Sequence, residues 1–455
     1  MIKELYYYDI FPKVFPVGRE VEITVRSLDE HTRFDGEYTV LVRPLDSGSA
    51  PNFADFMPEF RCDVTADPAS HGSLKFRYTA DHECEHFVRI FRKGSDARIV
   101  QLSIYALNAD LAERIPLRGD LHMHTCRSDG SQDPATVCAS YRGHGYDFIV
   151  ITDHYRYYPS LEARRVFADA PVFLNILPGE EVHLPRTNVH IVNAGGEFSV
   201  NGLLESSNNY QEKGDALEFR SLNGTAPDII PREEYDRQIE AIAAALPDDF
   251  PSDADRISYA VCCFAYDKIR EGNGLAIYAH PYWIANVWHV QEAMGRYMME
   301  KHPFDAFEVL GGENYYEQNG FQTAMYYDEY RHGRVHPIVG STDSHNCTEH
   351  NRNALICSTI VFAHKNERRD ILASIKDRYS VAVDTISAEY RLVGEFRLQK
   401  YASFLMDNWY PLHDKVAAMD GEQMLRFYAG DIPASDLEYT KSMAESQFDK
   451  YFVTL

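Results

Sequence analysis

The sequence predicts a chain of three parts, of which the middle part is an α/β domain with a barrel-like sheet. From about residue 113, short apolar segments typical of buried strands alternate with segments of helical periodicity. Histidines and carboxylates follow nearly every one of those strands, as expected where strand ends form an active site. Before residue 113, short runs alternate between apolar and polar side chains, which is typical of antiparallel strands.

Residues 1–112 are expected to form a small antiparallel, immunoglobulin-like β-sandwich. Apolar and polar side chains alternate in several runs, including 21–26, 38–42, 74–78 and 100–104. Turn-forming pairs such as Asp35-Gly36 separate these runs. Several short strands at this spacing are typical of a sandwich. We find no catalytic pattern in this part of the sequence, so we expect a structural role for it.

The central domain is expected over residues 113–385. Its strands after the first are predicted at 148–152, 172–177, 189–192, 275–279, 306–310, 337–342 and 381–383. A helix should begin at Pro134, with Asp133 as its cap. Strands that alternate with helices imply parallel pairing, and the carboxyl ends of parallel strands meet at one face. The polar residues after these strands should therefore converge.

Two further segments flank this pattern. An insertion occupies about residues 195–272 and contains two stretches of helical spacing, around 235–246 and 257–269. These helices could either cover the pocket or pack on the flank of the barrel. Residues 386–455 are expected to form a helical C-terminal extension, and its many aromatic side chains predict a packed subdomain.

The composition is that of a globular protein without membrane spans. Of 455 residues, 45% are hydrophobic and 25% are charged, and no uninterrupted apolar run reaches the length of a span. The net charge of −24 argues against nonspecific binding of nucleic acid or anionic membranes. The eight cysteines show no CxxC spacing, and no signal peptide is recognisable, so a cytoplasmic location is expected. The sequence is compatible with a homo-oligomer.

The most informative stretch is GDLHMHTCRSDG, residues 119–130. His122 and His124 follow an apolar run two positions apart, so a strand would project both imidazoles from one face. An HxH pair alone fits two solvent-facing histidines equally well. The segments ITDH, PGEEV, NVHIV, YAHP and GSTDSH follow at predicted strand ends, and they contribute His154, Glu180, Glu181, His190, His280, Asp343 and His345.

In this order the six segments resemble the motifs of the PHP superfamily (polymerase and histidinol phosphatase) over about residues 117–385. The resemblance implies a distorted (β/α)7 barrel with up to three metal ions at the carboxyl ends of its strands. It implies a first metal held by His122, His124 and Asp343, a second held by His190 and His280 with Glu181 bridging the two, and a third held by Asp129, His154 and His345. The family pattern Gly-x-Glu, counted from Gly179, favours Glu181 as the bridging ligand, but Glu180 stays open as an alternative.

The ligand types agree with hydrolytic chemistry on two to three divalent ions of zinc, iron or manganese. Adjacent ions lower the pKa of a bridging water and supply a hydroxide nucleophile. Glu181, Asp343 and His280 are the residues expected at this catalytic centre. Three divalent ions, less three carboxylates and one hydroxide, leave a local charge of about +2, which suits a phosphate monoester dianion.

Other residues near the motifs have candidate roles. Arg127 and Arg156 could bind phosphate oxygens, although surface ion pairs would explain them equally well. Tyr282 and Trp283, which follow His280, could line the pocket and stack on a ring of the substrate. Asp120 and Asp153 precede ligand histidines and are expected to orient imidazoles. Glu308 could lie near the site, whereas His183 and His289 show no pattern of their own.

The leading prediction is a metal-dependent phosphoesterase with a trinuclear site that acts on a small phosphorylated metabolite or nucleotide. The alternative is hydrolysis of a carbamate, carboxylic ester or amide bond at the same metal site. A metal-stabilised binding module without catalysis is the third hypothesis. The full set of nine ligands argues against it, because a scaffold does not need metal positions that are open to water.

Overall fold

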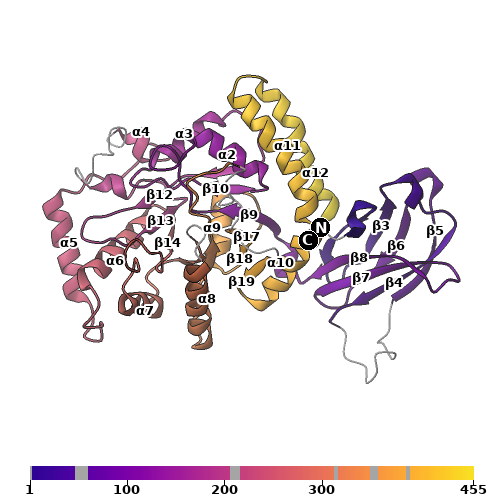
Figure 1. The fold of residues 1–455 in the computed structure, drawn as a ribbon, viewed down its shortest axis with the longest axis horizontal. Helices are drawn as coiled ribbons and strands as arrows, with labels where there is room; N and C mark the ends of the chain where they lie inside the picture. Colours follow the sequence, from indigo (N-terminus) through magenta and orange to yellow (C-terminus); the bar gives the residue numbers. More distant parts are fainter. Residues whose placement is uncertain are drawn as a thin grey trace. The chain divides into compact units, whose positions relative to one another are not determined.

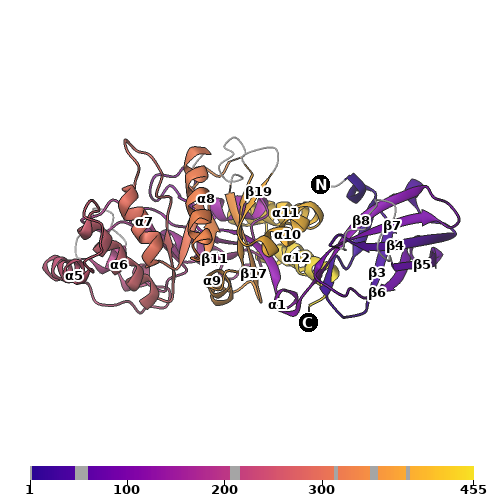
Figure 2. The same ribbon diagram turned by 90° about the horizontal axis from the view of Figure 1, so that it is seen from below.

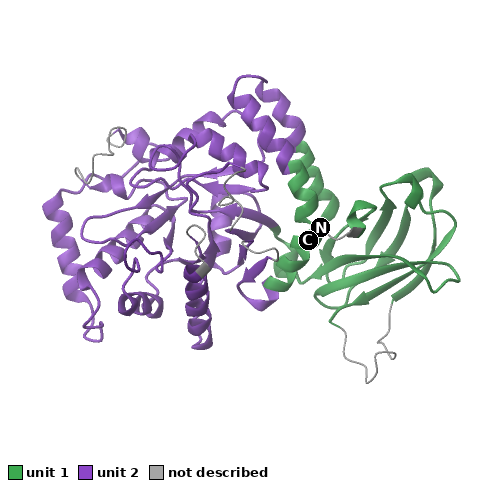
Figure 3. Ribbon diagram, in the orientation of Figure 1, with its two compact units in different colours: residues 1–115, 399–416, 442–455 green, residues 116–398, 417–441 purple. Residues whose placement is uncertain are grey.

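The computed structural model describes residues 3–46, 60–204, 216–311, 316–348, 357–385 and 390–454 (Figure 1). The chain divides into two compact units, and each of them joins distant parts of the sequence (Figure 3). The first unit consists of Met1–Ile115, Gln399–Val416 and Ser442–Leu455, and the second of Pro116–Leu398 and Ala417–Lys441. The C-terminal helices therefore contribute to both units.

The described strands of the first unit form two sheets. The three-stranded sheet has the order β1 (Tyr8–Phe11), β3 (Val21–Ser27), β6 (Leu74–Tyr78). The five-stranded sheet has the order β2 (Val14–Pro16), β8 (Arg98–Leu107), β7 (Cys84–Arg92), β4 (Glu37–Pro44), β5 (Phe60–Thr65). Neighbouring strands are antiparallel except for β2 and β8. Ile23 from one sheet and Val40, Ile90 and Ile104 from the other belong to one buried core, as alternating strands with one buried face require.

The C-terminal residues complete this unit. They come from α10 (Phe396–Asn408), α11 (Tyr410–Tyr428) and α12 (Leu437–Tyr451). The ring of Tyr105 on β8 lies 5.1 Å from that of Tyr401 on α10. After α12, Val453 N donates to Val14 O at 2.9 Å, so the end of the chain is hydrogen-bonded to β2. The extension is thus packed on the sheet through aromatic rings.

The second unit contains two further sheets and all the motif residues. The six-stranded sheet has the order β11 (Asn175–Leu177), β10 (Phe148–Val150), β9 (Ile115–Asp120), β17 (Cys357–Ala363), β18 (Ser380–Asp384), β19 (Arg391–Val393). The five-stranded sheet has the order β12 (Gly179–Val182), β13 (Ile191–Ala194), β14 (Leu275–Tyr278), β15 (Ala306–Leu310), β16 (Ile338–Gly340). Two isolated β-bridges lie outside these strand pairs. One joins Met123 to Ser344, and the other joins His154 to Glu181. The unit is a mixed α/β fold, and a closed (β/α)7 barrel stays a prediction.

The pairing of these strands is not parallel throughout, in contrast to the expectation from the sequence. β13 is antiparallel to both β12 and β14, and β18 is antiparallel to both β17 and β19. The link from Val182 to Ile191 contains no crossover helix, and a short link returns the chain in the opposite direction. As a result, His190 at the amino end of β13 lies at the same edge as the carboxyl ends of β12 and β14.

The helices of the second unit cover its sheets. They are α2 (Pro134–Gly143), α3 (Tyr158–Val166), α4 (Leu217–Arg220), α5 (Arg232–Ala245), α6 (Arg256–Glu271), α7 (Glu292–Lys301), α8 (Tyr316–Arg331) and α9 (Arg368–Lys376). The short helix α1 (Ala109–Ala112) belongs to the first unit and precedes β9. Asp133 accepts hydrogen bonds from the backbone N–H groups of Ala135 and Thr136, so it caps α2 as the sequence predicts. Short 3-10 helices occur at Lys3–Tyr6, Glu30–Thr32, Pro68–Ser70, Asn201–Leu203 and Ala434–Asp436.

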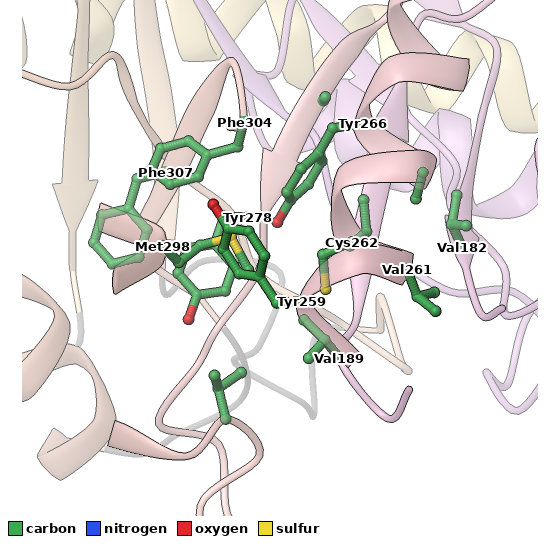
Figure 4. Packing of buried hydrophobic residues seen from close by; sticks show 14 of the residues in the cluster. Val182, Val189, Tyr259, Val261, Cys262, Tyr266, Tyr278, Met298, Phe304 and Phe307 are labelled. Carbon is green, nitrogen blue, oxygen red and sulfur yellow. The ribbon is translucent and has the colours of Figure 1, made fainter. Parts of the chain in front are cut away.

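The two helical stretches of the insertion form α5 and α6, which lie side by side in both views (Figure 1, Figure 2). Val261, Cys262 and Tyr266 of α6 belong to the same buried core as Tyr278 of β14 and Phe307 of β15 (Figure 4). The insertion is thus anchored on the five-stranded sheet by apolar packing. Within the described ranges, no helix combines the length and hydropathy that a membrane span needs.

Candidate metal centre

The nine ligands implied by the sequence motifs all lie at one edge of the two sheets of the second unit. They lie after β9 (His122, His124 and Asp129), after β10 (His154), within β12 (Glu181), before β13 (His190), after β14 (His280) and after β16 (Asp343 and His345). Three groups of donor atoms, each with its atoms within 4.8 Å of one another, match the implied sets: His122, His124 and Asp343; Glu181, His190 and His280; and His124, Asp129, His154 and His345. The first and third groups share His124, and His280 of the second lies 3.9 Å from Asp343 of the first, so the three groups are contiguous.

Glu181 lies at the centre of this cluster and is fully buried. Its carboxylate oxygens lie 2.5 Å from His154 Nδ1, 2.6 Å from His190 Nδ1, 3.6 Å from the Nε2 atoms of His122 and His124, and 3.7 Å from His280 Nε2. Burial alone would raise the pKa of Glu181, but the surrounding histidines hold it well below the usual range. A carboxylate that stays ionised and faces imidazoles on several sides suits a bridging ligand.

Glu180 points to a different environment, although it is also fully buried. Its carboxylate accepts hydrogen bonds from Asn193 Nδ2 (3.1 Å), Ser199 Oγ (2.6 Å), Val200 N (2.5 Å) and Asn201 Nδ2 (3.0 Å). These donors use the acceptor sites that a metal would need. Adjacent residues on β12 point to opposite faces, so only one of the two glutamates can face the cluster. The structure places Glu181 there.

Asp343 connects the first two groups. Its Oδ1 accepts a hydrogen bond from His124 Nε2 at 2.9 Å and lies 3.4 Å from His122 Nε2, while Oδ2 is 3.9 Å from His280 Nε2. The backbone of Asp343 has a φ of +50°, which is uncommon for a residue other than glycine. Residues held in such conformations cluster at functional sites, because the surrounding structure has to maintain them. Here the hydrogen bond from Asp343 N to His122 O (2.9 Å) contributes.

The third group is more accessible than the others. Asp129, whose side chain is 54% exposed, places Oδ2 3.4 Å from His345 Nε2 and 3.5 Å from His154 Nε2. Burial lowers the pKa of His154, but Glu181 and Asp129 together raise it to about 11. Two carboxylates thus favour positive charge at this end of the cluster.

Asp120 and Asp153 do not contact imidazole rings, in contrast to the prediction. Asp120 accepts from His122 N (3.1 Å) and from both the backbone N–H and the hydroxyl of Thr342. Asp153 accepts from Thr125 N and Oγ1 and from Ser128 Oγ. Asp120 is the last residue of β9 and Asp153 lies just after β10, so their hydrogen bonds brace the ligand-bearing loops. Burial raises the pKa of Asp120 to about 7.

Two residues without a convincing sequence pattern lie in the cluster. Glu308 on β15 places Oε2 2.9 Å from His122 Nδ1. His183 Nε2 lies 2.8 Å from His154 Nδ1 and 3.5 Å from the Glu181 carboxylate. The spacing of Glu181 and His183, two apart along a strand, could have revealed the shared face. Glu308 is a single carboxylate within an apolar strand, and only the fold shows what it contacts.

The donor atoms of the cluster fit bound divalent ions. Among the described residues, no hydrogen-bond partner serves His122 Nε2, His124 Nδ1, either oxygen of Glu181, or either ring nitrogen of His280. Each buried polar atom without a partner costs roughly 1–3 kcal/mol. Imidazole nitrogens and carboxylate oxygens are ligands for zinc, iron and manganese. These residues therefore fit a metal site.

A cavity of about 710 Å³ adjoins the cluster. His154, His183 and His190 form a wall of histidines in it, and Trp283, Trp288 and Arg232 are among its other lining residues. Arg232 is the first residue of α5, so the insertion contributes to the pocket as well as to the core. Both alternatives for the insertion hold in part.

The remaining predicted substrate residues are placed differently. Trp283 lines the cavity, but the ring of Tyr282 packs 5.4 Å from Trp288 and 5.5 Å from Phe321. Arg127 forms a bidentate ion pair with Glu162, with Nε at 3.0 Å and Nη2 at 2.5 Å. Arg156 Nη1 lies 3.4 Å from Tyr158 Oη. Neither arginine is among the residues that line the cavity.

Fold and site together define an α/β protein with a histidine- and carboxylate-rich cluster at its strand ends that could hold metal ions. The chain matches no protein-family model and no curated protein. Among solved structures it is similar to a two-domain protein from Bacteroides vulgatus that contains a predicted PHP-like metal-dependent phosphoesterase, at 15% identity and a TM-score of 0.37. The match covers 59% of this chain and 65% of that one.

Two further structures are similar over about half of this chain. A protein from Bifidobacterium adolescentis assigned as a metal-dependent phosphoesterase shows 19% identity and a TM-score of 0.32, over 51% of this chain and 89% of that one. An amidohydrolase from Chromobacterium violaceum, with sulfate bound and no metal, shows 17% identity and a TM-score of 0.30, over 50% and 87%.

Proposed function

We propose that this protein is a metal-dependent phosphoesterase that hydrolyses a small phosphate monoester. The observation that carries the proposal is the convergence of three contiguous donor groups around the buried carboxylate of Glu181. Such a set exceeds what a single structural ion needs, because a structural zinc site is closed by four ligands. A multinuclear centre beside a cavity is the usual arrangement for hydrolysis.

In this proposal, His122, His124 and Asp343 hold one ion, His190 and His280 hold a second with Glu181 shared, and Asp129, His154 and His345 hold a third. Divalent ions at these positions would supply Lewis acidity, which activates water as a nucleophile and neutralises charge on the phosphate. The protein's contribution is preorganisation. Glu308 fixes His122 through Nδ1, and Asp120 and Asp153 fix the loops, so the donor atoms are in place before substrate binds.

The third donor group favours phosphorus over carbon as the reacting atom. A phosphate dianion has three equatorial oxygens whose charge has to be neutralised, and two ions can contact only some of them. A carbamate or ester develops one oxyanion, for which two ions suffice. The third group would hold the additional cation that a phosphate requires. It consists of Asp129, His154 and His345, and Asp129 is accessible.

A specific observation favours the second candidate, hydrolysis of a carbamate, carboxylic ester or amide. Arg127 is a candidate for binding phosphate oxygens, but the guanidinium edge formed by Nε and Nη2 is paired with Glu162. The Arg127 guanidinium is therefore already paired within the protein, so it is less available to a phosphate. Hydrolysis at carbon does not need that contact.

The cavity is suited to the organic part of a small substrate. Its volume of about 710 Å³ is within the usual range of small-molecule sites. In this proposal the phosphate lies against the histidine wall, and the organic group lies toward Trp283 and Trp288. Aromatic side chains in such a position offer flat apolar surface for a ring or an alkyl group.

The test begins with protein purified without chelator. We expect elemental analysis to find two to three transition-metal ions per chain, and a panel of phosphomonoesters, phosphodiesters and carboxylic esters to show phosphomonoesters as the best substrates. Chelation should abolish hydrolysis, and zinc, manganese or ferrous ions should restore it. His154→Ala should lower kcat/KM for phosphomonoesters by roughly 100-fold or more, which is about 3 kcal/mol.

Two results would contradict the proposal. Faster turnover of a carboxylic ester, with His154→Ala leaving that turnover intact, would establish the second candidate. A fully metal-loaded protein that hydrolyses no member of the panel would favour a binding module.

A further inference from the structure

A second group of metal-ligating side chains lies in the first unit, in the sequence Asp81-His82-Glu83-Cys84-Glu85-His86. The alternation places His82, Cys84 and His86 on the same side of the chain where β7 begins. Cys84 and His86 are buried, whereas the His82 side chain is 39% exposed. This group shares no residue with the cluster around Glu181.

The distances within this group are close to those of a metal site. His82 Nε2 lies 3.6 Å from Cys84 Sγ, and Cys84 Sγ lies 3.9 Å from each ring nitrogen of His86. In tetrahedral zinc coordination, bonds of about 2.3 Å to sulfur and about 2.0–2.1 Å to nitrogen separate the two ligand atoms by roughly 3.6 Å. The His82–Cys84 pair already has that separation, and the Cys84–His86 pair exceeds it by about 0.3 Å.

In both His82 and His86, Nδ1 lies within hydrogen-bonding distance of an oxygen, so Nε2 is the atom left to bind a metal. His82 Nδ1 lies 2.6 Å from Asp81 Oδ1, and His86 Nδ1 lies 3.0 Å from Cys84 O. A neutral imidazole that donates from Nδ1 presents a lone pair on Nε2. A histidine whose far nitrogen binds a carboxylate or a carbonyl is the usual arrangement around protein-bound metals.

A close contact at His82 Nε2 supplies an independent observation. This atom lies 2.8 Å from the backbone oxygen of Asp46, the last described residue after β4. A neutral ring can donate from only one nitrogen, so the contacts to Asp81 and Asp46 are both satisfied only when the ring holds a second proton or a cation. A metal ion at Nε2 would take the place of that second proton, and the Asp46 oxygen would then be available as a fourth ligand.

The electrostatic surroundings support a bound cation. The carboxylate of Asp81 lies 2.6 Å from His82 Nδ1, so negative charge adjoins the group. The buried Cys84 thiol would lose its proton on binding a metal.

We propose that His82, Cys84 and His86, with the Asp46 carbonyl, form a zinc-class structural site that links the start of β7 to the end of β4. Thiolate and imidazole donors select zinc over harder ions such as Mg²⁺ or Ca²⁺. The site stabilises the first unit and takes no part in hydrolysis.

The experiment is a Co²⁺ titration of the full chain, monitored by the thiolate-to-cobalt charge-transfer absorption. Because the cluster around Glu181 contains no cysteine, this absorption reports the proposed site. We expect a saturable band in the wild-type protein that is lost in Cys84→Ser. The matched controls are Cys62→Ser on β5 and Cys126→Ser, which is exposed beside His124, and both should retain the band.

A second variant covers the case in which Cys84→Ser fails to fold. His82→Asn, at a partly exposed position, should weaken Co²⁺ binding at the thiolate site roughly 10-fold or more, as should Asp81→Asn. Hydrolytic activity should be unchanged in both variants. The proposal is overturned if the wild type shows no band, if the band is lost in Cys126→Ser instead, or if His82→Asn binds Co²⁺ with wild-type affinity.

Discussion

His122 Nδ1 and Glu308 Oε2 lie 2.9 Å apart, and both side chains are completely buried. Nδ1 donates to the carboxylate, so Nε2 is left as the acceptor, and Nε2 is the atom that faces Glu181 at 3.6 Å and Asp343 at 3.4 Å. The pair therefore fixes both the tautomer and the orientation of a ligand ring. Burial lowers the pKa of His122, but the nearby carboxylates raise it well above its usual value, so a metal ion bound at Nε2 would displace a proton from this ring.

The first prediction concerns Glu308→Gln, which removes the charge and keeps the shape. A carboxamide can still bond His122 but polarises it less, so metal affinity at the first group should fall roughly 10–100-fold. Metal titration of the apoprotein measures the loss, and excess metal should restore kcat. If Glu308→Gln lowers only the melting temperature and leaves metal affinity unchanged, Glu308 is a structural residue and not a positioning residue.

The second prediction uses the adjacent pair Glu180 and Glu181 as matched variants. Glu181→Gln should reduce the metal content by at least one ion and abolish hydrolysis, because the bridging carboxylate is lost. Glu180→Gln should keep the metal content but lower the free energy of unfolding by roughly 1–3 kcal/mol, since an amide cannot accept all four hydrogen bonds of the carboxylate. Elemental analysis and denaturant unfolding distinguish them. The opposite outcome, metal loss in Glu180→Gln alone, would exchange the two roles.

Much of the candidate site could be predicted because its residues obey local rules. His122 and His124 are two apart after an apolar run, and the period of a strand places them on one face whatever the rest of the fold does. Asp343 and His345 are also two apart after β16, but the φ of +50° at Asp343 departs from a strand and the two residues belong to different donor groups. The carboxyl ends of strands that alternate with helices meet at one face, which explains why distant motifs could be combined.

The parts that could not be predicted depend on contacts between distant residues. His190 reaches the cluster because β13 is antiparallel, and nothing in its own segment specifies the direction of that strand. Glu308 is 186 positions from His122 in the sequence. The pairing of Arg127 with Glu162 depends on how α3 packs beside the loop after His124. In each case, the tertiary fold determines the contact.

The third prediction concerns the pocket. Trp283 lines the cavity beside His190, with the two rings 6.0 Å apart. Trp283→Ala should raise KM for aryl phosphates several-fold to 10-fold, consistent with the loss of about 1 kcal/mol of ring contact, and should leave kcat nearly unchanged. Small alkyl phosphates are the control, because they offer no ring for stacking. Equal effects on aryl and alkyl substrates would show that Trp283 maintains the shape of the loop and does not bind substrate.

The last prediction concerns the pH dependence of stability and involves His336, which lies outside the metal cluster. His336 is 3% exposed, and burial together with the nearby His302 lowers its pKa to about 4, although Glu329 opposes this shift. The ordinary value is 6.5, so between pH 6.5 and 4 the unfolded chain binds a proton that the folded chain excludes. Stability is therefore present above pH 6.5 and is lost as the pH falls through this window, by at most about 3 kcal/mol for a shift of this size.

His336→Leu should remove that part of the loss, as measured by denaturant unfolding of the chelator-treated protein from pH 4 to 7.5. His332→Leu, at an exposed position after α8, is the matched control and should keep the wild-type slope. Parallel curves for the wild type and His336→Leu would contradict the prediction and would mean that His336 gains its proton in the folded state.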